Sequence, residues 1–420
     1  MRRAGTVTCF TTLALNNISL RVMYAVSQRL PDCRSQSECA GSLFGGVGRA
    51  VAKLVVHLSM FTTMAAYLNS LGRTIMNEMY GTRVCLPVAT ACALVVLFPF
   101  AQLRSYGDIT VISLVSFAAV VLLVLLIMSA SSHVEPDPAA ARSFWPPSSP
   151  SDSLSSVAGF FFASGGGQCA FFEYLSEMEN PNDYLNTLWL TSPALFALYY
   201  GTAAIMYDRF GDKVPGFLLD ILPFDYTRLI GNSLFFFHII VSFTIYNTAL
   251  LRSYATYSVT DGRWEAKQEW VLMSAGVLAG MYVITNLFSL FEDMTAATGA
   301  LLITTIVLIV PPTYLLAASK FKRRDEEKTA AEGGVGGMED GGSDAGKVSV
   351  GTGTRIWLHI MIALGLVVVP LTVWGATVRL VNDANNVSPP FSCGPCVTRE
   401  CIEGAKNASI VATLAGRVEF

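Results

Sequence analysis

The sequence predicts an all-α protein that crosses a membrane about ten times. Of its 420 residues, 52% are hydrophobic and only 14% are charged, whereas a soluble domain averages about 25% charged residues. Ten stretches approach the roughly 20 apolar residues that a helix needs to cross a bilayer. One of them is interrupted by three consecutive glycines. In chain order, the stretches are 5–26, 54–72, 85–103, 108–130, 156–176, 188–207, 229–251, 270–291, 295–318 and 356–380.

The first stretch, 5–26, is the least apolar, because Asn16, Asn17 and Arg21 interrupt it. Two arginines precede it, so a signal peptide is an alternative interpretation of this segment. The run continues past Arg21 to Tyr24, which favours a spanning helix. The other stretches are more continuously apolar, and polar loops separate most of them.

The positive charges of the loops predict the orientation of the chain. Five loops of one set hold fifteen Lys and Arg, and the four loops of the other set hold six. Loops rich in Lys and Arg stay in the cytoplasm, so the first set is expected there. The first set is 27–53, 104–107, 177–187, 252–269 and 319–355, and the second is 73–84, 131–155, 208–228 and 292–294.

Two polar segments complete this topology. The charged and glycine-rich residues 319–355 predict a disordered cytoplasmic loop. The polar residues 381–420 are expected as an exoplasmic tail. Asn386 and Asn407 begin glycosylation sequons in this tail, which agrees with its placement.

The tail also holds Cys393, Cys396 and Cys401. Cys393 and Cys396 have the spacing of a thioredoxin-type redox pair, but a short polar tail lacks the βαβ context of such an enzyme. A disulfide among the three cysteines suits an exoplasmic segment better. A zinc half-site is a weaker alternative, because no histidine lies nearby.

The glycine break is the strongest functional signal. Gly165, Gly166 and Gly167 stand between Ser164 and Gln168 within the apolar stretch 156–176. Each glycine costs about 1 kcal/mol against alanine in a helix interior, and an opened backbone in lipid must line a cavity or be buried in protein. The functional interpretation is an unwound substrate site whose amides meet a carboxylate. The alternative is close helix packing.

Three other polar residues within apolar stretches are candidates for coupling or ion contact. Glu173 follows the break, and an ionisable residue at that depth is a functional candidate. It carries either a mobile proton or a fixed structural charge. Thr244 and Asn247, three residues apart on one helix face, offer oxygens to a cation or bond a neighbouring helix.

Several function classes have no visible machinery. The sequence holds no P-loop, nucleophile elbow, His-rich metal motif or Rossmann glycine set. We therefore expect no enzyme, no cofactor and no metal site. The net charge of −3 and the absence of a large basic block give no reason to expect a nucleic-acid partner.

Several segments resemble the amino acid/auxin permease family of secondary transporters. Residues 162–181 resemble its broken helix, and residues 207–223 resemble its loop of the form Tyr-x-x-Phe-Gly-Asp that ends in Leu-Pro. Residues 97–114 resemble its paired-helix junction, and residues 292–316 its tenth helix. The resemblance is strongest over 155–320.

The family implies a leucine-transporter-type bundle of eleven helices with two inverted five-helix repeats. Against that pattern the ten stretches correspond to helices two to eleven, so the resemblance implies that the first helix, which carries half of the substrate site, is lacking. A truncated start and a form that does not transport both account for this departure. In this fold the helix of residues 54–72 lines the site, which makes Tyr67 and Asn69 further substrate-binding candidates.

The resemblance implies a carrier of small-molecule amino acids driven by H⁺ or Na⁺, with Ser164 to Gln168 at its substrate site. It is expected in the lipid bilayer of the plasma membrane or of the vacuole or lysosome. A non-transporting nutrient sensor on the same scaffold is the alternative. Substrate identity, direction of transport and oligomeric state do not follow from the residues.

Overall fold

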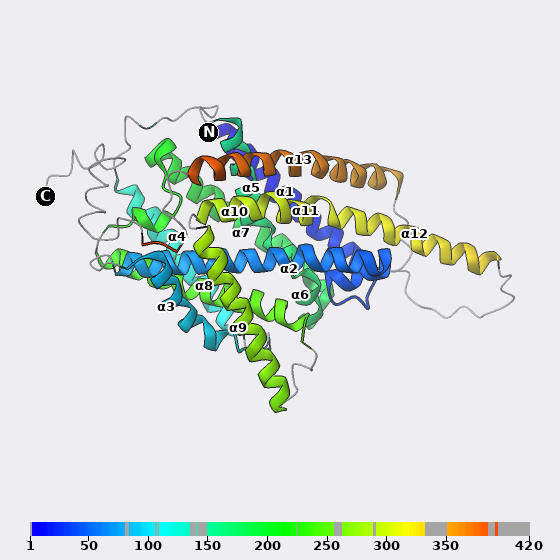
Figure 1. Ribbon diagram of the computed structural model, residues 1–420. Coiled ribbons are helices and arrows are strands. Elements are labelled where there is room, and N and C mark those ends of the chain that lie inside the picture. Colours follow the sequence, from blue (N-terminus) through cyan, green and yellow to red (C-terminus); the bar gives the residue numbers. More distant parts are fainter. Residues whose placement is uncertain are drawn as a thin grey trace.

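The computed structural model describes residues 2–79, 84–105, 107, 109–134, 140, 149–223, 225–255, 263–288, 291–331, 351–384 and 391–393. Within these ranges the regular structure is helical, and none of them contains a strand. The predicted all-α polytopic membrane fold is confirmed. Figure 1 shows the bundle, in which α12 extends beyond the other helices at one end.

The α-helices in chain order are α1 (Arg2–Ser27), α2 (Gln36–Glu78), α3 (Leu86–Phe100), α4 (Thr110–Ser132), α5 (Pro150–Gly165), α6 (Phe171–Glu177), α7 (Tyr184–Phe210), α8 (Tyr226–Arg252), α9 (Trp264–Leu287), α10 (Phe291–Thr298), α11 (Thr304–Leu308), α12 (Val310–Ala331) and α13 (Thr352–Ala384). The 3₁₀ turns are η1 (Gly166–Gln168), η2 (Pro181–Asp183), η3 (Gly211–Lys213) and η4 (Leu218–Ile221). A π-helical turn, η5 (Gly299–Ile303), joins α10 to α11.

Within the described residues, every stretch predicted to span the membrane falls mainly on helix, although the individual helices differ in length and hydropathy. Among the described residues, seven helical stretches are long and apolar enough to cross a membrane. The stretches 5–26, 85–103 and 156–176 are not among these seven. The polar residues of α1 lower its hydropathy, α3 has only 15 residues, and α5 stops at the glycine break after 16 residues.

Helix α2 begins earlier than the loop 27–53 predicts. Ser35 caps it by accepting a hydrogen bond from the Glu38 amide at 3.2 Å, and Gly45 then breaks the helix with φ of 72° and ψ of −162°. A positive φ is readily adopted by glycine. The segment before Gly45 is helical because Cys39 and Leu43 are buried in an apolar cluster with Phe171 and Leu315.

The prediction of a disordered loop over residues 319–355 is partly wrong. Helix α12 continues to Ala331, and α13 already begins at Thr352. The stretch from 319 to 331 contains no glycine or proline and is rich in Ala, Lys, Arg and Glu, which favour helix. Residues 332–350 lie outside the described residues.

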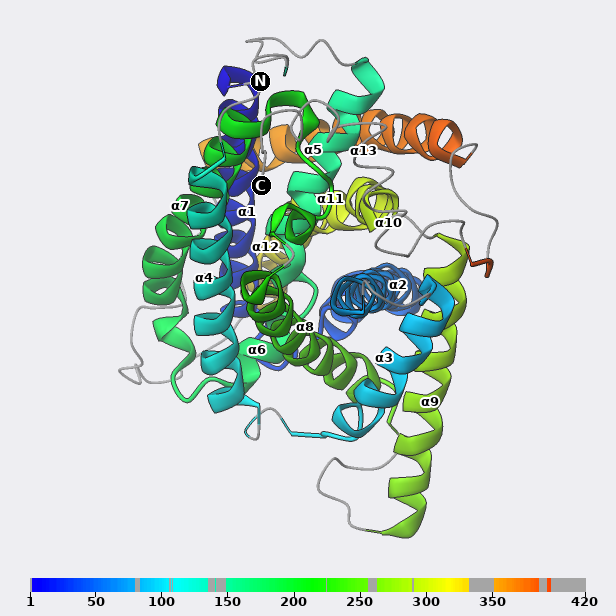
Figure 2. The ribbon, with the colours of Figure 1, turned by 90° about the vertical axis from the view of Figure 1, so that its left-hand side faces the viewer.

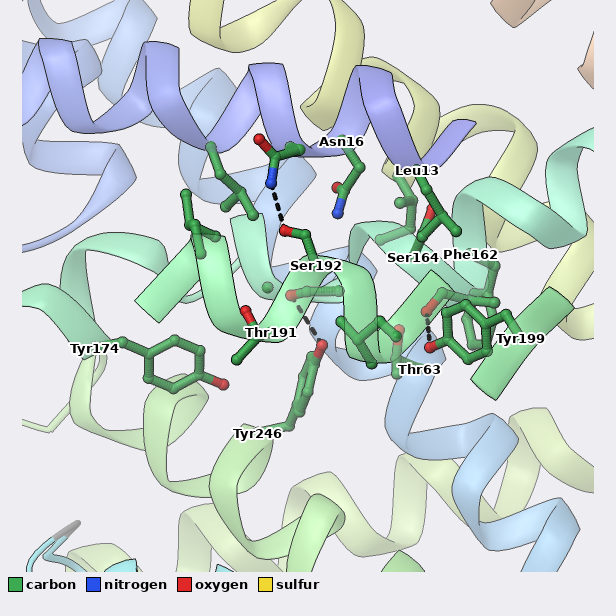
Figure 3. A pocket seen from close by; sticks show the side chains of 18 of the residues that line it. Leu13, Asn16, Thr63, Phe162, Ser164, Tyr174, Thr191, Ser192, Tyr199 and Tyr246 are labelled. Carbon is green, nitrogen blue, oxygen red and sulfur yellow. Dashed lines mark hydrogen bonds between the residues drawn. The ribbon is translucent and has the colours of Figure 1, made fainter. Parts of the chain in front are cut away.

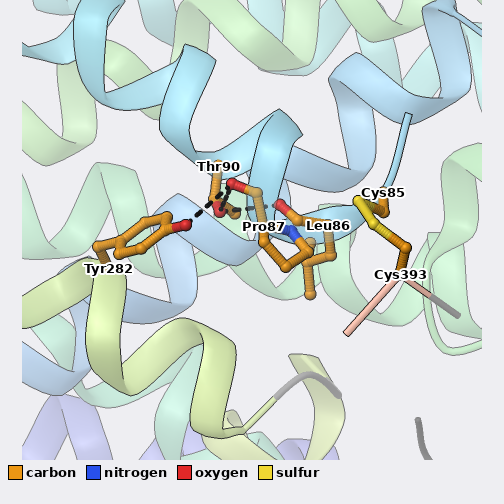
Figure 4. The surroundings of a disulfide bond; sticks show 6 residues. All are labelled: Cys85, Leu86, Pro87, Thr90, Tyr282 and Cys393. Carbon is orange, nitrogen blue, oxygen red and sulfur yellow. Dashed lines mark hydrogen bonds between the residues drawn. A yellow bond between two sulfur atoms is a disulfide. The ribbon is translucent and has the colours of Figure 1, made fainter. Parts of the chain in front are cut away.

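The disulfide of the tail also differs from the prediction. Cys393 is bonded to Cys85, which precedes α3, and not to another cysteine of the tail (Figure 4). The bond joins residues 308 positions apart, a contact that the spacing of the tail cysteines cannot indicate. The topology predicted from charge places both cysteines on the exoplasmic side. Cys396, Cys401, Asn386 and Asn407 lie outside the described residues.

Helix α5 lies among α1, α11 and α13 (Figure 2). Its backbone is approached closely from two sides. A Cβ atom added at Gly299 would overlap the carbonyl oxygen of Ala158, and one added at Gly375 would lie 2.8 Å from the carbonyl oxygen of Ser151. Glycines in membrane helices permit this close approach, so the position of the broken helix depends on them.

We expect Gly299→Ala to destabilise the protein by about 1–3 kcal/mol, because the new methyl group meets backbone that cannot move aside. Gly276→Ala in α9 is a matched control, since no heavy atom lies within 4 Å of its added Cβ and alanine favours helix. Thermal unfolding of the purified protein in detergent measures both. Equal midpoints for the two variants would contradict the close approach of η5 to α5.

Candidate functional site

The chain is unwound between α5 and α6. Helix α5 ends at Gly165, whose φ of −96° and ψ of 1° depart from helical values, and the 3₁₀ turn η1 follows. Ala170 departs again, with φ of −113° and ψ of 24°, before α6 begins at Phe171. The break lies where the three glycines predict it.

Two tyrosines satisfy carbonyl groups at the break. Tyr246 of α8 donates its hydroxyl hydrogen to the carbonyl oxygen of Gly166 at 2.9 Å, and Tyr199 of α7 donates to that of Ala163 at 2.9 Å. In a membrane such groups cannot rely on water, so protein partners are needed. Tyr67 packs edge-to-face on Tyr246, with ring centroids 5.9 Å apart, which restricts the position of that ring.

A cavity of about 360 Å³ lies beside the break (Figure 3). This volume is within the range of small-molecule sites, about 300–1,000 Å³. Helices α1, α2, α5, α6, α7 and α8 contribute to its wall together with η1 and η5. The lining residues are Leu13, Asn16, Asn17, Leu20, Thr63, Tyr67, Phe162, Ala163, Ser164, Gly166, Gly167, Tyr174, Leu188, Thr191, Ser192, Leu195, Tyr199, Tyr246 and Ile303.

The wall of this cavity carries polar groups but no charged side chain. A charged group placed there would lose water without gaining an opposite charge from the wall, which costs several kcal/mol. Amide and hydroxyl groups can instead bind a molecule through hydrogen bonds. The cavity therefore suits a small molecule whose own charges are balanced.

The end of the cavity at the break favours positive charge. It is the carbonyl end of the 16-residue helix α5, where the helix dipole is negative. Because Tyr199 and Tyr246 give their hydrogens to carbonyl groups, their oxygens remain hydrogen-bond acceptors. This polarity suits an ammonium group, whereas the glycine motif alone suggested that backbone amides would meet a carboxylate.

The part of the wall that faces Tyr246 is formed by asparagines of α1 and by a serine of α7. Asn17 of α1 donates from Nδ2 to the hydroxyl oxygen of Ser192 on α7. Its neighbour Asn16 accepts a hydrogen bond at Oδ1 from Gln168. The labelled Asn16 and Ser192 lie across the cavity from Tyr246 in Figure 3.

The predicted substrate-binding residues divide into two groups. Ser164, Gly166, Gly167 and Tyr67 line the cavity. Gly165 does not line it, because it packs against Ile303 and Val307, which an added Cβ would meet. Close packing thus accounts for Gly165, whereas Gly166 and Gly167 line the cavity and their role in substrate binding stays a prediction.

Gln168 and Asn69 are buried outside the cavity wall. Gln168 ties the break to its surroundings, because its side chain bonds Asn16 and its carbonyl oxygen accepts from Gln36. Asn69 donates to the carbonyl oxygen of Phe288 at 3.4 Å. Both residues thus connect neighbouring elements in this conformation.

The coupling candidates also lie outside the cavity wall. Thr244 donates to the carbonyl oxygen of Ile240 in its own helix at 2.8 Å, and Asn247 donates to that of Ala101 at 3.2 Å. Glu173 in α6 is half-buried, and its Oε2 is buried with no hydrogen-bond partner among the described residues. Of these three candidates, Glu173 is the one whose side chain is titratable.

Sequence reasoning missed the two asparagines and the tyrosines Tyr199 and Tyr246. The asparagines were visible as polar interruptions of an apolar stretch, which is a signal for a site as well as a weakness of the span. The tyrosines gave no such signal. Tyrosine is common at membrane interfaces, and only the fold shows that these two reach the break.

Comparison with known families agrees with this geometry. The family described as "Transmembrane amino acid transporter protein" matches residues 3–332, a range that holds the break and the whole cavity wall. A comparison with curated proteins gave no match. The chain belongs to the transmembrane amino acid transporter family.

Proposed function

We propose that this amino acid transporter is a secondary active carrier that binds its substrate in the cavity beside the break. The observation that carries the proposal is that the unwound segment, which membrane carriers place at their substrate sites, forms part of the wall of an uncharged polar cavity. Alternating access would open this cavity to each side of the membrane in turn. The break allows α5 and α6 to move separately during that change.

The substrate class follows from the chemistry of the wall. An amino acid with an uncharged side chain is a zwitterion, and its two charged groups can be met by acceptors at the break and by donors on α1 and α7. A charged side chain would need a counter-charge that the wall lacks. Neutral amino acids are therefore the proposed substrates.

Glu173 is the proposed site of proton coupling. A proton on its carboxyl group would remove the charge from this half-buried side chain and would leave the buried Oε2 on a neutral group. Because α6 follows the break directly, a change of charge there would act on the segment expected to move. Sodium is the alternative driving ion.

The proposal is tested by uptake of a radiolabelled amino acid panel into proteoliposomes, with and without an inward proton or sodium gradient. We expect gradient-dependent uptake of neutral amino acids. Uptake of lysine and glutamate should be lower than that of neutral amino acids by about tenfold or more, since burying one uncompensated charge costs more than about 1.4 kcal/mol. Binding without uptake would favour the nutrient sensor. The absence of both binding and uptake would contradict the proposal.

We expect Gly166→Ala to lower neutral amino acid uptake at least about tenfold. The added Cβ would lie 2.5 Å from the Tyr246 hydroxyl, which would have to leave the Gly166 carbonyl and enter the cavity. A lost hydrogen bond with a displaced buried side chain costs about 1–3 kcal/mol. Gly159→Ala, in α5 before the break and with no atom within 4 Å of its added Cβ, should transport normally. Similar uptake by the two variants would contradict the claim that the break forms part of the substrate site.

We expect Glu173→Gln to keep amino acid binding but to lose the stimulation of uptake by an inward proton gradient, because glutamine cannot take up a proton. Glu179→Gln is the control, since that carboxylate is exposed beyond the end of α6. Uptake is compared at equal and at unequal pH across the liposome membrane. Proton stimulation that survives in Glu173→Gln would exclude this residue as the coupling site.

A further inference from the structure

We propose that Asn17 contacts the carboxylate group of the substrate, and that Arg21 is the positioning residue that orients Asn17 for this contact. The inference rests on the proposed function, because it assigns the group that reads one end of an amino acid in that cavity. Neither residue belongs to the break.

The hydrogen bond between these residues fixes the orientation of the asparagine amide. Arg21 donates from Nε to Oδ1 of Asn17 at 2.8 Å, and the two residues are one helical turn apart on α1. An arginine side chain has donors only, so the amide oxygen must face Arg21. The amide nitrogen then faces the other way, towards the cavity that Asn17 lines.

Arg21 is held in place by a second helix. Its guanidinium carbon lies 5.0 Å from the centre of the Trp189 ring on α7, a distance at which a cation is attracted to an aromatic face. Arg21 does not line the cavity. Its positive charge therefore lies behind Asn17, where it favours an anion without binding it directly.

Asn17 and Ser192 together present hydrogen-bond donors on this part of the cavity wall. One hydrogen of Asn17 Nδ2 goes to the Ser192 hydroxyl oxygen, and among the described residues the nitrogen has no other partner. Ser192, which accepts this bond and lines the cavity, keeps its own hydroxyl hydrogen. Two donors with a positive charge behind them suit a carboxylate, which only accepts.

The two walls have opposite polarity. The tyrosine oxygens and the carbonyl end of α5 accept hydrogen bonds, and the Asn17–Ser192 pair donates them. A zwitterion placed between them would direct its ammonium group to the break and its carboxylate to α1. This assigns to α1 a specificity role that the polar interruptions of its sequence did not by themselves establish.

The test compares amino acids with their carboxamides, which lack the carboxylate but keep the ammonium group. The probes are L-alanine, L-leucine, L-alaninamide and L-leucinamide. Their affinities are measured by the thermal stabilisation of the purified full chain, which rises with ligand saturation. Competition against radiolabelled uptake gives a second, independent measurement.

We expect the wild-type protein to prefer each amino acid over its amide about tenfold or more, the effect of one good hydrogen bond to a charged group. Arg21→Gln should reduce this preference about tenfold, because it should weaken the binding of the amino acid more than the binding of the amide. Asn17→Asp keeps the size and the contact with Arg21 but presents only acceptors, so it should reverse the preference. Arg29→Gln, which removes an arginine bonded at 3.0 Å to the Ala25 carbonyl oxygen, should behave as wild type.

A purely structural role for Arg21 predicts lower stability with an unchanged ratio of affinities. An unchanged ratio in both Arg21→Gln and Asn17→Asp would overturn the inference, and would leave the proposed function intact if uptake persists. If Arg21→Gln does not fold, the isosteric Asn17→Asp decides alone. If no amino acid binds or is taken up by the wild-type chain, the proposed function fails, and the inference fails with it.

Discussion

Backbone groups that a helix break frees inside a membrane must find partners in the protein, and this requirement organises the site. Tyr246 and Tyr199 come from two different helices and bond the carbonyl groups of Gly166 and Ala163. The break therefore cannot exist without α7 and α8 beside it. The same two hydrogen bonds leave tyrosine oxygens as acceptors at the cavity, so the groups that satisfy the break also give this wall its polarity.

The three glycines of the break have different surroundings. Gly165 allows Ile303 and Val307 to approach α5, and Gly166 leaves room for the Tyr246 hydroxyl. Gly167 has no neighbouring atom where a Cβ would stand, and it lines the cavity. One motif thus provides both a close packing contact and part of the cavity wall. The π-helical turn η5 lies on the packing side, where its Gly299 meets the backbone of α5.

The sequence predicted what local physics determines. Hydropathy located the helices, and the cost of three glycines in a helix located the break. It could not predict that Cys393 pairs with Cys85 or that Tyr199 reaches Ala163, because these contacts join residues far apart in the chain. The helix from 319 to 331 was not predicted, because its charges and the glycines that follow it are typical of a disordered loop. The inverted repeat came from the family resemblance alone and stays a prediction.

The measurement that tests the central claim most directly is substrate protection of a cysteine placed in the cavity wall. Thr191→Cys, in a chain whose exposed Cys92 is replaced by alanine, is labelled with a thiol reagent with and without a saturating neutral amino acid. Thr187→Cys, one turn away on the same face of α7 but outside the wall, is the control. We predict that the amino acid slows labelling only at position 191. Equal labelling rates at position 191 with and without the amino acid would contradict binding in this cavity.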